Sequence, residues 1–232
     1  MDPELKASLS ACSTASVASA LLKLGLRNVW LRGVRPIAGA ATLRVGTAFT
    51  MRFLPLREDL GGDGGLKLPT SREAIEAIER GSFAVIEARG VTDAGVAGDV
   101  LCARMESRGV AGLVTDGAIR DVAGVELTGL PVWAGGTASP APGNSLTFAD
   151  WGLPVACGGA AVFPGDIIAA DRDGAIVIPA HMAERVAAEA AEIDRFDAWV
   201  ITKVQAGEPL PGLYPPHAEN LARYRRETGQ GS

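Results

Sequence analysis

Residues 94–121, AGVAGDVLCARMESRGVAGLVTDGAIRD, decide the fold. They follow SFAVIEA at 82–88, an apolar run of strand length. Within the stretch, DVLCARMESRG places apolar residues at helical spacing, and AGLVTDG is a second strand of the buried type. Two such strands joined by a helix form a β-α-β unit with parallel strands and a right-handed crossover. The sequence therefore predicts an α/β fold.

The N-terminal side adds a helix and two strands. Residues 13–24, STASVASALLKL, carry apolar side chains at helical spacing behind a serine or threonine cap, and Gly25 is suited to closing the helix. Segments 28–33 and 43–53 are rich in β-branched and apolar residues, which predicts strands. Residues 56–68, charged and then glycine-rich, predict an exposed loop.

A second helix follows that loop, and a long one occupies the C-terminal region. Thr70 or Ser71 is expected to cap a helix that ends at Gly81. Short apolar runs then alternate with turns, including a hairpin that turns at residues 171–174. From 180 to about 206 the chain is nearly free of glycine, which predicts one long helix before a short last helix around 217–226.

The composition and net charge indicate the number of domains and the partners to expect. The 232 residues are 47% hydrophobic, which suits one packed domain over 1–232 with a C-terminal helical extension from about 180 to 232. The net charge is -5 and no Lys and Arg cluster could follow a phosphate backbone, so we expect no nucleic-acid partner. Without a signal pattern or an apolar run of roughly 18 to 20 residues, we expect no membrane association and a cytoplasmic location.

The cysteines and histidines carry no chemistry in this interpretation. Cys12, Cys102 and Cys157 are odd in number and widely spaced, so we expect small core residues and not disulfides or zinc ligands. His181 and His217 are expected at the surface or at helix caps, without a catalytic role.

Polar residues gather at the carboxyl edge of the predicted β-α-β unit. Parallel strands end at the same edge, so Gly98 and Asp99 at the helix start should face a loop with Asp116, Arg120 and Asp121. The spacing alone is equally compatible with a helix cap, an ordinary turn and a surface ion pair.

A site built from these residues would suit a small oxo acid. The first-turn amides at Asp99, Val100 and Leu101 could hold a carboxylate, and Gly98 would let it approach. Arg120 matches a carboxylate or a developing oxyanion. Asp99 and Asp121 are hard oxygen donors suited to Mg2+ or Mn2+. Aldol cleavage and decarboxylation both release an enolate that such a site would stabilise, and spacing does not choose between them.

The chain resembles the regulator of ribonuclease activity A-like family. Its aldolase members carry Asp, twenty intervening residues and then Arg-Asp, as Asp99, Arg120 and Asp121 do here. Matching segments cover nearly the whole chain: TASVASALLKLGLRN at 14–28, GDVL at 98–101, RGVAGLVTDGAIRD at 108–121, GLPVWA at 129–134 and VFPGDIIAADRDGAIVIP at 162–179.

The resemblance implies an α/β/β sandwich of the swivelling-domain type, assembled as a homotrimer or a dimer of trimers. It implies a metal-dependent aldolase that cleaves 4-hydroxy-2-oxo acids, such as 4-hydroxy-4-methyl-2-oxoglutarate, to pyruvate and also decarboxylates oxaloacetate. Asp121 would be the metal ligand, Arg120 would bind the substrate carbonyl, and Asp99 would position a metal-bound water. The amides of Val100 and Leu101 would receive the pyruvyl carboxylate.

Two departures leave the substrate and the function open. Many members have Ser-Asp-Ala-Leu where this chain has ASAL at 18–21, so an acidic side chain is absent there. The tripeptide Arg57, Glu58 and Asp59 is similar to one found in a branch of the family labelled as ribonuclease regulators. These side chains could line the part of the pocket farthest from the pyruvyl half of the substrate, or form a solvated run of charges. A protein-binding regulator of ribonuclease E, and a metal-dependent dehydratase or decarboxylase of another oxo acid, are the alternative functions.

Overall fold

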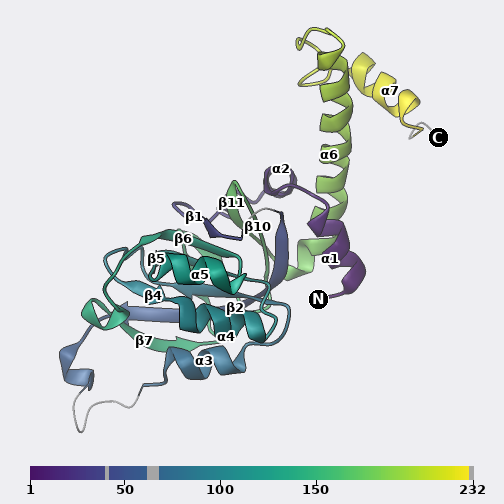
Figure 1. The fold of residues 1–232 in the computed structure, drawn as a ribbon. Coiled ribbons are helices and arrows are strands. Elements are labelled where there is room, and N and C mark those ends of the chain that lie inside the picture. The colour runs from purple at the N-terminus through teal and green to yellow at the C-terminus, as the bar shows by residue number, and fades with distance from the viewer. Residues whose placement is uncertain (40–41, 62–67, 230–232) are drawn as a thin grey trace.

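The computed structural model describes residues 1–39, 42–61 and 68–229, and shows a mixed α/β fold with N-terminal helices and a long C-terminal helix (Figure 1). The strands are β1 (Arg35–Ala38), β2 (Arg44–Pro55), β3 (Ser82–Glu87), β4 (Gly95–Ala97), β5 (Gly112–Ile119), β6 (Val132–Thr137), β7 (Leu146–Trp151), β8 (Val155–Cys157), β9 (Ala160–Val162), β10 (Ile167–Asp171) and β11 (Gly174–Ile178). The helices are α1 (Pro3–Ser10), α2 (Thr14–Lys23), α3 (Ser71–Ala77), α4 (Asp99–Ser107), α5 (Val122–Thr128), α6 (Ala183–Gln205) and α7 (Ala218–Glu227), with 3-10 turns η1 (Glu58–Gly61), η2 (Pro142–Asn144) and η3 (Ala180–Met182).

One mixed sheet organises the described part of the chain. Its order is β1-β6-β5-β3-β2-β10-β11, with β4 paired to β5 and β7 paired to β2. Strands β2, β3, β5 and β6 are parallel neighbours, and β4 also runs parallel to β5. The strands β1, β7, β10 and β11 are antiparallel to their partners. The end strands β1 and β11 lie close together, so the sheet is nearly closed.

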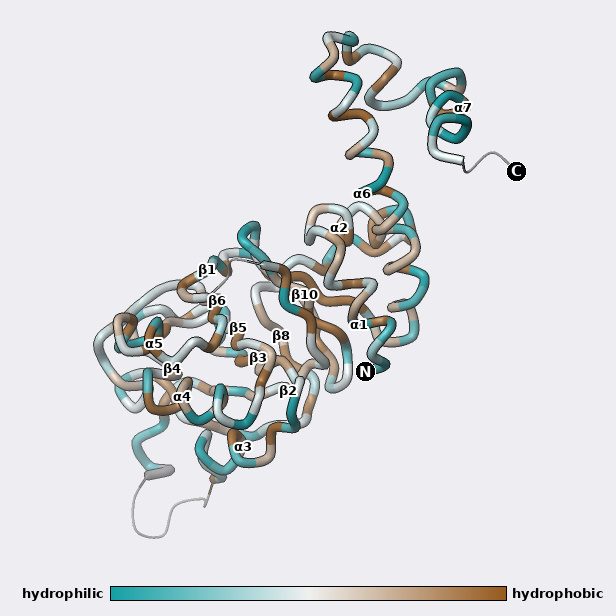
Figure 2. The backbone as a smooth tube through the Cα atoms, turned by 45° about the vertical axis from the view of Figure 1, so that its right-hand side comes forward, coloured by the Kyte–Doolittle hydropathy of each residue, from teal (hydrophilic) through white to brown (hydrophobic). Residues whose placement is uncertain are grey.

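The inner residues of strand β3, 83–86, are apolar without interruption. Phe83 and Val85 belong to a core that includes residues of α2, β10, β11 and α6. Ala84 and Ile86 point to the opposite face, into a core shared with α3, α4 and α5. Because successive side chains of a strand alternate between faces, a strand buried on both sides is apolar at every position. Figure 2 shows hydrophobic residues along the strands and polar residues along much of α6 and α7.

Most predicted elements are confirmed, and one strand is wrong. Ser13 caps α2, Gly25 follows it with a φ of +89°, and the hairpin β10–β11 pairs Asp171 with Gly174. Segment 28–33 forms no strand, because only Trp30 makes an isolated bridge and Gly33 turns the chain at a φ of +79°. Instead, β1 is the first strand of the sheet, and the short strand β4 was not predicted.

The predicted exposed loop over 56–68 is described only in part. Residues 58–61 form η1, and residues 62–67 lie outside the described part of the chain. The following helix, α3, ends four residues before the predicted Gly81. Its start is as expected, because Thr70 and Glu73 form a capping box.

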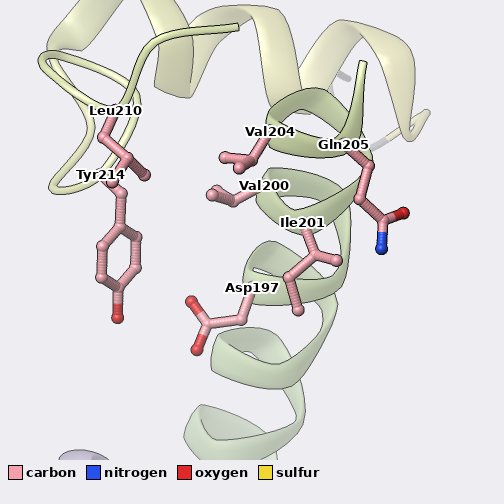
Figure 3. A pocket seen from close by; sticks show the side chains of 7 residues that line it. All are labelled: Asp197, Val200, Ile201, Val204, Gln205, Leu210 and Tyr214. Carbon is pink, nitrogen blue, oxygen red and sulfur yellow. The ribbon is translucent and has the colours of Figure 1, made fainter. Parts of the chain in front are cut away.

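The C-terminal arm, α6 with α7, has a small core of its own. The first half of α6 lies beside α1 and α2, and the second half projects away from the sheet (Figure 1). There Tyr224 packs edge to face with Phe196 and with Trp199, with ring centroids 5.1 and 5.5 Å apart. The rings of Phe196 and Trp199 are tilted relative to each other at 5.9 Å. An apolar cavity of about 360 Å³ lies between α6 and the segment that follows it (Figure 3), lined by Asp197, Val200, Ile201, Val204, Gln205, Leu210 and Tyr214.

Glu227 should couple the packing of the arm to pH. Lys203 foremost, then Trp199 and Arg223, lowers the pKa of Glu227 from the ordinary 4.5 to about 2. Because the pKa of this carboxyl group is lower in the folded arm, its ionised form stabilises the arm at pH values above 4.5. This stabilisation is lost as the pH falls toward about 2. The indole N–H of Trp199 donates to Glu227 Oε2 at 2.9 Å. Its NMR signal should therefore stay constant down to pH 4 and shift below it, whereas a midpoint near 4.5 would contradict this assignment.

Close packing in the parallel sheet should make Gly46 intolerant of a side chain. A Cβ at Gly46 would lie 2.7 Å from the Gly81 carbonyl oxygen and 3.0 Å from the Ala111 Cβ. Gly46→Ala should therefore lower the free energy of unfolding by about 1–3 kcal/mol. Gly143→Ala is the matched control, because a Cβ there meets nothing within 4 Å. Chemical denaturation of both variants measures the difference; equal unfolding free energies would show that the sheet relaxes around the added methyl group.

Candidate functional site

The start of α4 forms one wall of the candidate site. Strand β4 leads directly into Gly98, the N-cap residue, which offers no side chain to cap the helix. The first helical hydrogen bond runs from the Cys102 amide to the Gly98 carbonyl oxygen at 3.0 Å, so the Leu101 amide precedes it and lacks a helical acceptor. The Val100 amide instead donates to Asp99 Oδ1 at 2.7 Å. Of the two amides predicted to receive a carboxylate, Val100 is therefore engaged by Asp99.

Arg120 and Asp121 lie at the opposite wall, where β5 turns into α5. The Arg120 amide donates to the Ala97 carbonyl oxygen at 3.0 Å, which ties this turn to β4. The Arg120 Nε donates to Asp121 Oδ2 at 2.9 Å. Asp121 adopts a left-handed backbone, φ 54° and ψ 41°, which is uncommon for a residue with a Cβ and is found disproportionately at functional sites. The two side chains are 37% and 41% exposed, so a ligand can reach both.

Two glycines allow the acidic side chains to lie this close to the opposite wall. A Cβ at Gly98 would lie 2.6 Å from Asp121 Oδ2, and a Cβ at Gly124 would lie 2.7 Å from Asp99 Oδ2. Each carboxylate therefore rests against bare backbone on the facing turn. The β4–α4 turn and the β5–α5 turn are thereby held together by packing that any larger residue would disrupt.

These residues border a single cavity of about 360 Å³. Its lining comprises Ser71, Arg72, Gly95, Val96, Ala97, Gly98, Asp99, Val100, Leu101, Arg120, Asp121, Ala141 and Pro142. The structure thus brings together every residue that the sequence assigned to substrate or metal binding. Their catalytic roles remain predictions, because their placement alone does not test chemistry.

Ser71 and Arg72 are lining residues that the sequence reasoning missed. They begin α3, and α3 contacts α4, which brings them to the cavity. The capping box predicted where α3 starts, but no local signal predicted which element it would contact. Arg57 and Asp59 instead pair with each other, with Arg57 Nε 3.0 Å from Asp59 Oδ1, and neither lines this cavity.

Asp116 lies elsewhere, inside β5 and not in the predicted loop. Its carboxylate accepts the Ala88 amide at 2.6 Å and the Gly90 amide at 3.1 Å. Burial raises the pKa of Asp116, and these hydrogen bonds partly oppose that effect. Asp116 lines a separate cavity, so the expectation that it would face Asp99 is wrong.

Two carboxylates are available to a metal ion at the candidate cavity. Among the residues that the structure describes, no group of three or more His, Cys, Asp and Glu side chains could hold one. Asp99 and Asp121 both line the cavity, and their side chains lie on facing turns. This donor set fits an ion such as Mg2+, which is commonly held by one or two carboxylates together with water and substrate oxygens.

The cysteines are buried and unpaired, as predicted. Burial foremost, together with the nearby charge of Asp99, raises the pKa of Cys102 to about 12, so its thiol is protonated and unreactive at neutral pH.

His181 is exposed in η3, and His217 precedes α7 without capping it through its side chain. No single described helix is long and apolar enough to cross a membrane. Helices α1 and α2 together meet the length and composition of such a span, but they are bent by 106° at the break between them.

The chain is similar in sequence to proteins from other organisms. Protein DlpA of Legionella pneumophila is 27% identical over 208 residues, 90% of this chain and 33% of that protein. A Halalkalibacterium halodurans protein named "Putative 4-hydroxy-4-methyl-2-oxoglutarate aldolase" is 36% identical over 114 residues, 49% of this chain and 54% of that protein. In both comparisons, the match spans less than two thirds of the relative.

A solved structure and a family profile extend the comparison. RraAS2 of Streptomyces coelicolor, described as an unusual member of the RNase ES inhibitor RraA protein family, superposes with a TM-score of 0.77 at 32% identity. The superposition covers 86% of this chain and 96% of that one. The family profile described as "RraA-like: Aldolase/RraA" matches residues 14–177. That match covers well over half of the chain, and the protein therefore belongs to the RraA-like family.

Proposed function

We propose that the protein is a divalent-metal-dependent lyase of the aldolase type that cleaves a 4-hydroxy-2-oxo acid to pyruvate. The observation that carries the proposal is the convergence of Asp99, Arg120 and Asp121 on one cavity at the start of α4. Membership of a family that includes aldolases, and the name of the Halalkalibacterium relative, support the same reaction class.

The first turn of α4 would bind the carboxylate of the pyruvyl half. The Leu101 amide lacks a helical acceptor, and the positive end of the helix dipole favours an anion there. Gly98 lets the Asp121 carboxylate lie against its backbone, and Arg120, which lines the same cavity, would direct its guanidinium toward the 2-oxo oxygen. Arg120 would exchange part of its contact with Asp121 for the substrate when the site is filled.

Asp121 would hold Mg2+ or Mn2+, with Asp99 near enough to orient the surrounding water. When bound there, the metal ion would polarise the 2-oxo carbonyl as a Lewis acid. The bond from the Val100 amide keeps the Asp99 carboxylate oriented. The Leu101 amide stays available to the substrate.

The residues at the cavity would support the cleavage through charge and proton transfer. The C4 hydroxyl loses its proton to a water molecule oriented by Asp99, the C3–C4 bond breaks, and the electron pair forms the enolate of pyruvate. The Arg120 guanidinium stabilises the enolate oxygen. Return of the proton to C3 gives pyruvate, and C4 leaves as the new carbonyl group. Loss of carbon dioxide from oxaloacetate produces the same enolate, so we expect decarboxylase activity as well.

Arg120→Ala should abolish most of the lyase activity. Removing a donor that stabilises a developing oxyanion lowers kcat by about 100- to 1000-fold. Pyruvate release from 4-hydroxy-4-methyl-2-oxoglutarate and from oxaloacetate, measured with Mg2+, tests this. Arg120→Lys should recover part of the rate, since the charge remains while the planar fork is lost. Arg44→Ala is the control, because Arg44 is exposed and does not line the cavity. Wild-type rates for Arg120→Ala would contradict the proposed role.

Asp121→Asn should weaken divalent-metal binding, and this can be measured without turnover. Replacing a charged oxygen ligand by a neutral amide lowers the affinity for a hard cation. Titration of Mn2+, followed by electron paramagnetic resonance, should show binding to wild-type protein that is weakened in Asp121→Asn. Asp93→Asn is the matched control, because Asp93 is exposed and lies outside the cavity lining. Equal Mn2+ affinity in all three proteins would exclude Asp121 as a ligand.

A second candidate function is inhibition of an RNase E-type ribonuclease by direct binding. The similarity to RraAS2, whose description names an RNase ES inhibitor family, favours it. Inhibition needs a surface and no oxo-acid site, so Arg120→Ala should inhibit as well as wild-type protein does. Ribonuclease inhibition without pyruvate release from any tested oxo acid would replace the lyase proposal. The expected homotrimer or dimer of trimers remains a prediction in either case.

A further inference from the structure

A second polar cavity, of about 480 Å³, lies apart from the candidate lyase site. It is lined by Arg32, Gly33, Arg89, Gly90, Thr92, Asp116, Gly135, Gly158 and Gly159. None of these residues lines the cavity that contains Arg120. The segment that connects β3 to α4 borders both, with Arg89, Gly90 and Thr92 at this cavity and residues 95–98 at the other.

Two guanidinium groups at this cavity have no acidic partner within the described part of the chain. Arg32 makes one long hydrogen bond, from Nη2 to the Gly159 carbonyl oxygen at 3.4 Å, and no side-chain hydrogen bond or ion pair is formed by Arg89 there. Arg104 and Arg223, by comparison, each form an ion pair with a glutamate at 2.7 Å. Two unpaired guanidinium groups lining one hollow match an oxyanion, which can accept bidentate hydrogen bonds from each.

Asp116 does not neutralise these arginines by direct pairing. Its two carboxylate oxygens accept backbone amides, at 2.6 Å from Ala88 and 3.1 Å from Gly90. These bonds flank Arg89 and hold its backbone at a φ of +59°, a conformation rare for residues other than glycine, asparagine and aspartate. The carboxylate thus positions Arg89 at the cavity, and strain of this kind concentrates at ligand-binding sites.

The remaining lining is mostly bare backbone. Five of the nine lining residues are glycines, and a Cβ at Gly33 or Gly90 would meet nothing within 4 Å. The hollow is therefore open, and a ligand could contact main-chain groups directly. Its volume lies in the usual range for small-molecule pockets and exceeds the needs of a single inorganic ion.

We infer that this cavity binds a small organic molecule with one or two oxyanion groups, a carboxylate or a phosphate ester, held by Arg32 and Arg89. Thr92 adds a hydroxyl group at the same hollow. This ligand would bind at a different site from the proposed lyase substrate, because neither α4 nor Arg120 lines this cavity. The inference therefore does not depend on the proposed function.

Calorimetric titration with succinate and with glycerol 3-phosphate tests the inference, and succinamide and glycerol serve as uncharged counterparts. At constant ionic strength, at least one charged probe should bind wild-type protein and neither uncharged probe should. Arg89→Gly should weaken that binding by about 10- to 100-fold, as expected for a lost hydrogen bond to a charged group. Glycine suits the positive φ at this position, so this variant should keep the fold. Arg89→Lys should retain part of the affinity.

Two control variants show whether the probe binds at this cavity. Arg44→Ala removes an exposed arginine outside both cavities and should bind the probe like wild-type protein. Arg120→Ala should also bind it normally, because Arg120 lines the other cavity. Binding that survives in the double variant Arg32→Ala and Arg89→Gly would overturn the inference, as would loss of binding in Arg120→Ala or failure of both charged probes at millimolar concentration.

Discussion

The parallel pairing of β5 with three neighbours is the constraint on which both polar cavities depend. Strand β5 hydrogen-bonds with β3, β4 and β6, and its course places Asp116 in the strand and Arg120 just beyond its end. The register between β4 and β5 shifts where Gly95 and Ala97 pair with the end of β5. That irregularity brings the first turn of α4 against Arg120 and Asp121. Because side chains of a strand are tied to its register, a slip of one residue would separate these groups.

The sequence predicted much of the fold because its central strands are continuously apolar and are joined by a helix. Strands buried on both faces, such as β3, show continuous hydrophobic runs, and α4 between two of them indicates a parallel crossover. The wrong strand at 28–33 has a local cause: the apolar run Val29–Leu31 resembles a strand, but Gly33 turns the chain and the Arg32 amide donates to the Gly158 carbonyl oxygen. That partner lies far along the sequence, so composition could not predict it.

The candidate site was predictable in its membership and not in its detail. Asp99, Arg120 and Asp121 could be grouped because parallel strands end at one edge of a sheet. The left-handed backbone of Asp121, and the use of the Val100 amide by Asp99, depend on the contact between two turns. Arg72 was missed for a similar reason, since its place at the cavity comes from the packing of α3 on α4. Asp116 was misplaced because Asp-Gly usually indicates a turn, whereas here the strand continues through it.

The ion pair between Arg120 and Asp121 contributes little to the stability of the fold. The Arg120 and Asp121 side chains are 37% and 41% exposed, and ion pairs at such exposure add little to stability. The two main cores, by contrast, consist of buried apolar residues of the sheet and the helices that cover it. The backbone around the cavities is held by glycine contacts and by the buried Asp116. Removing a guanidinium group therefore changes the charge of a cavity while the packing that shapes it stays in place.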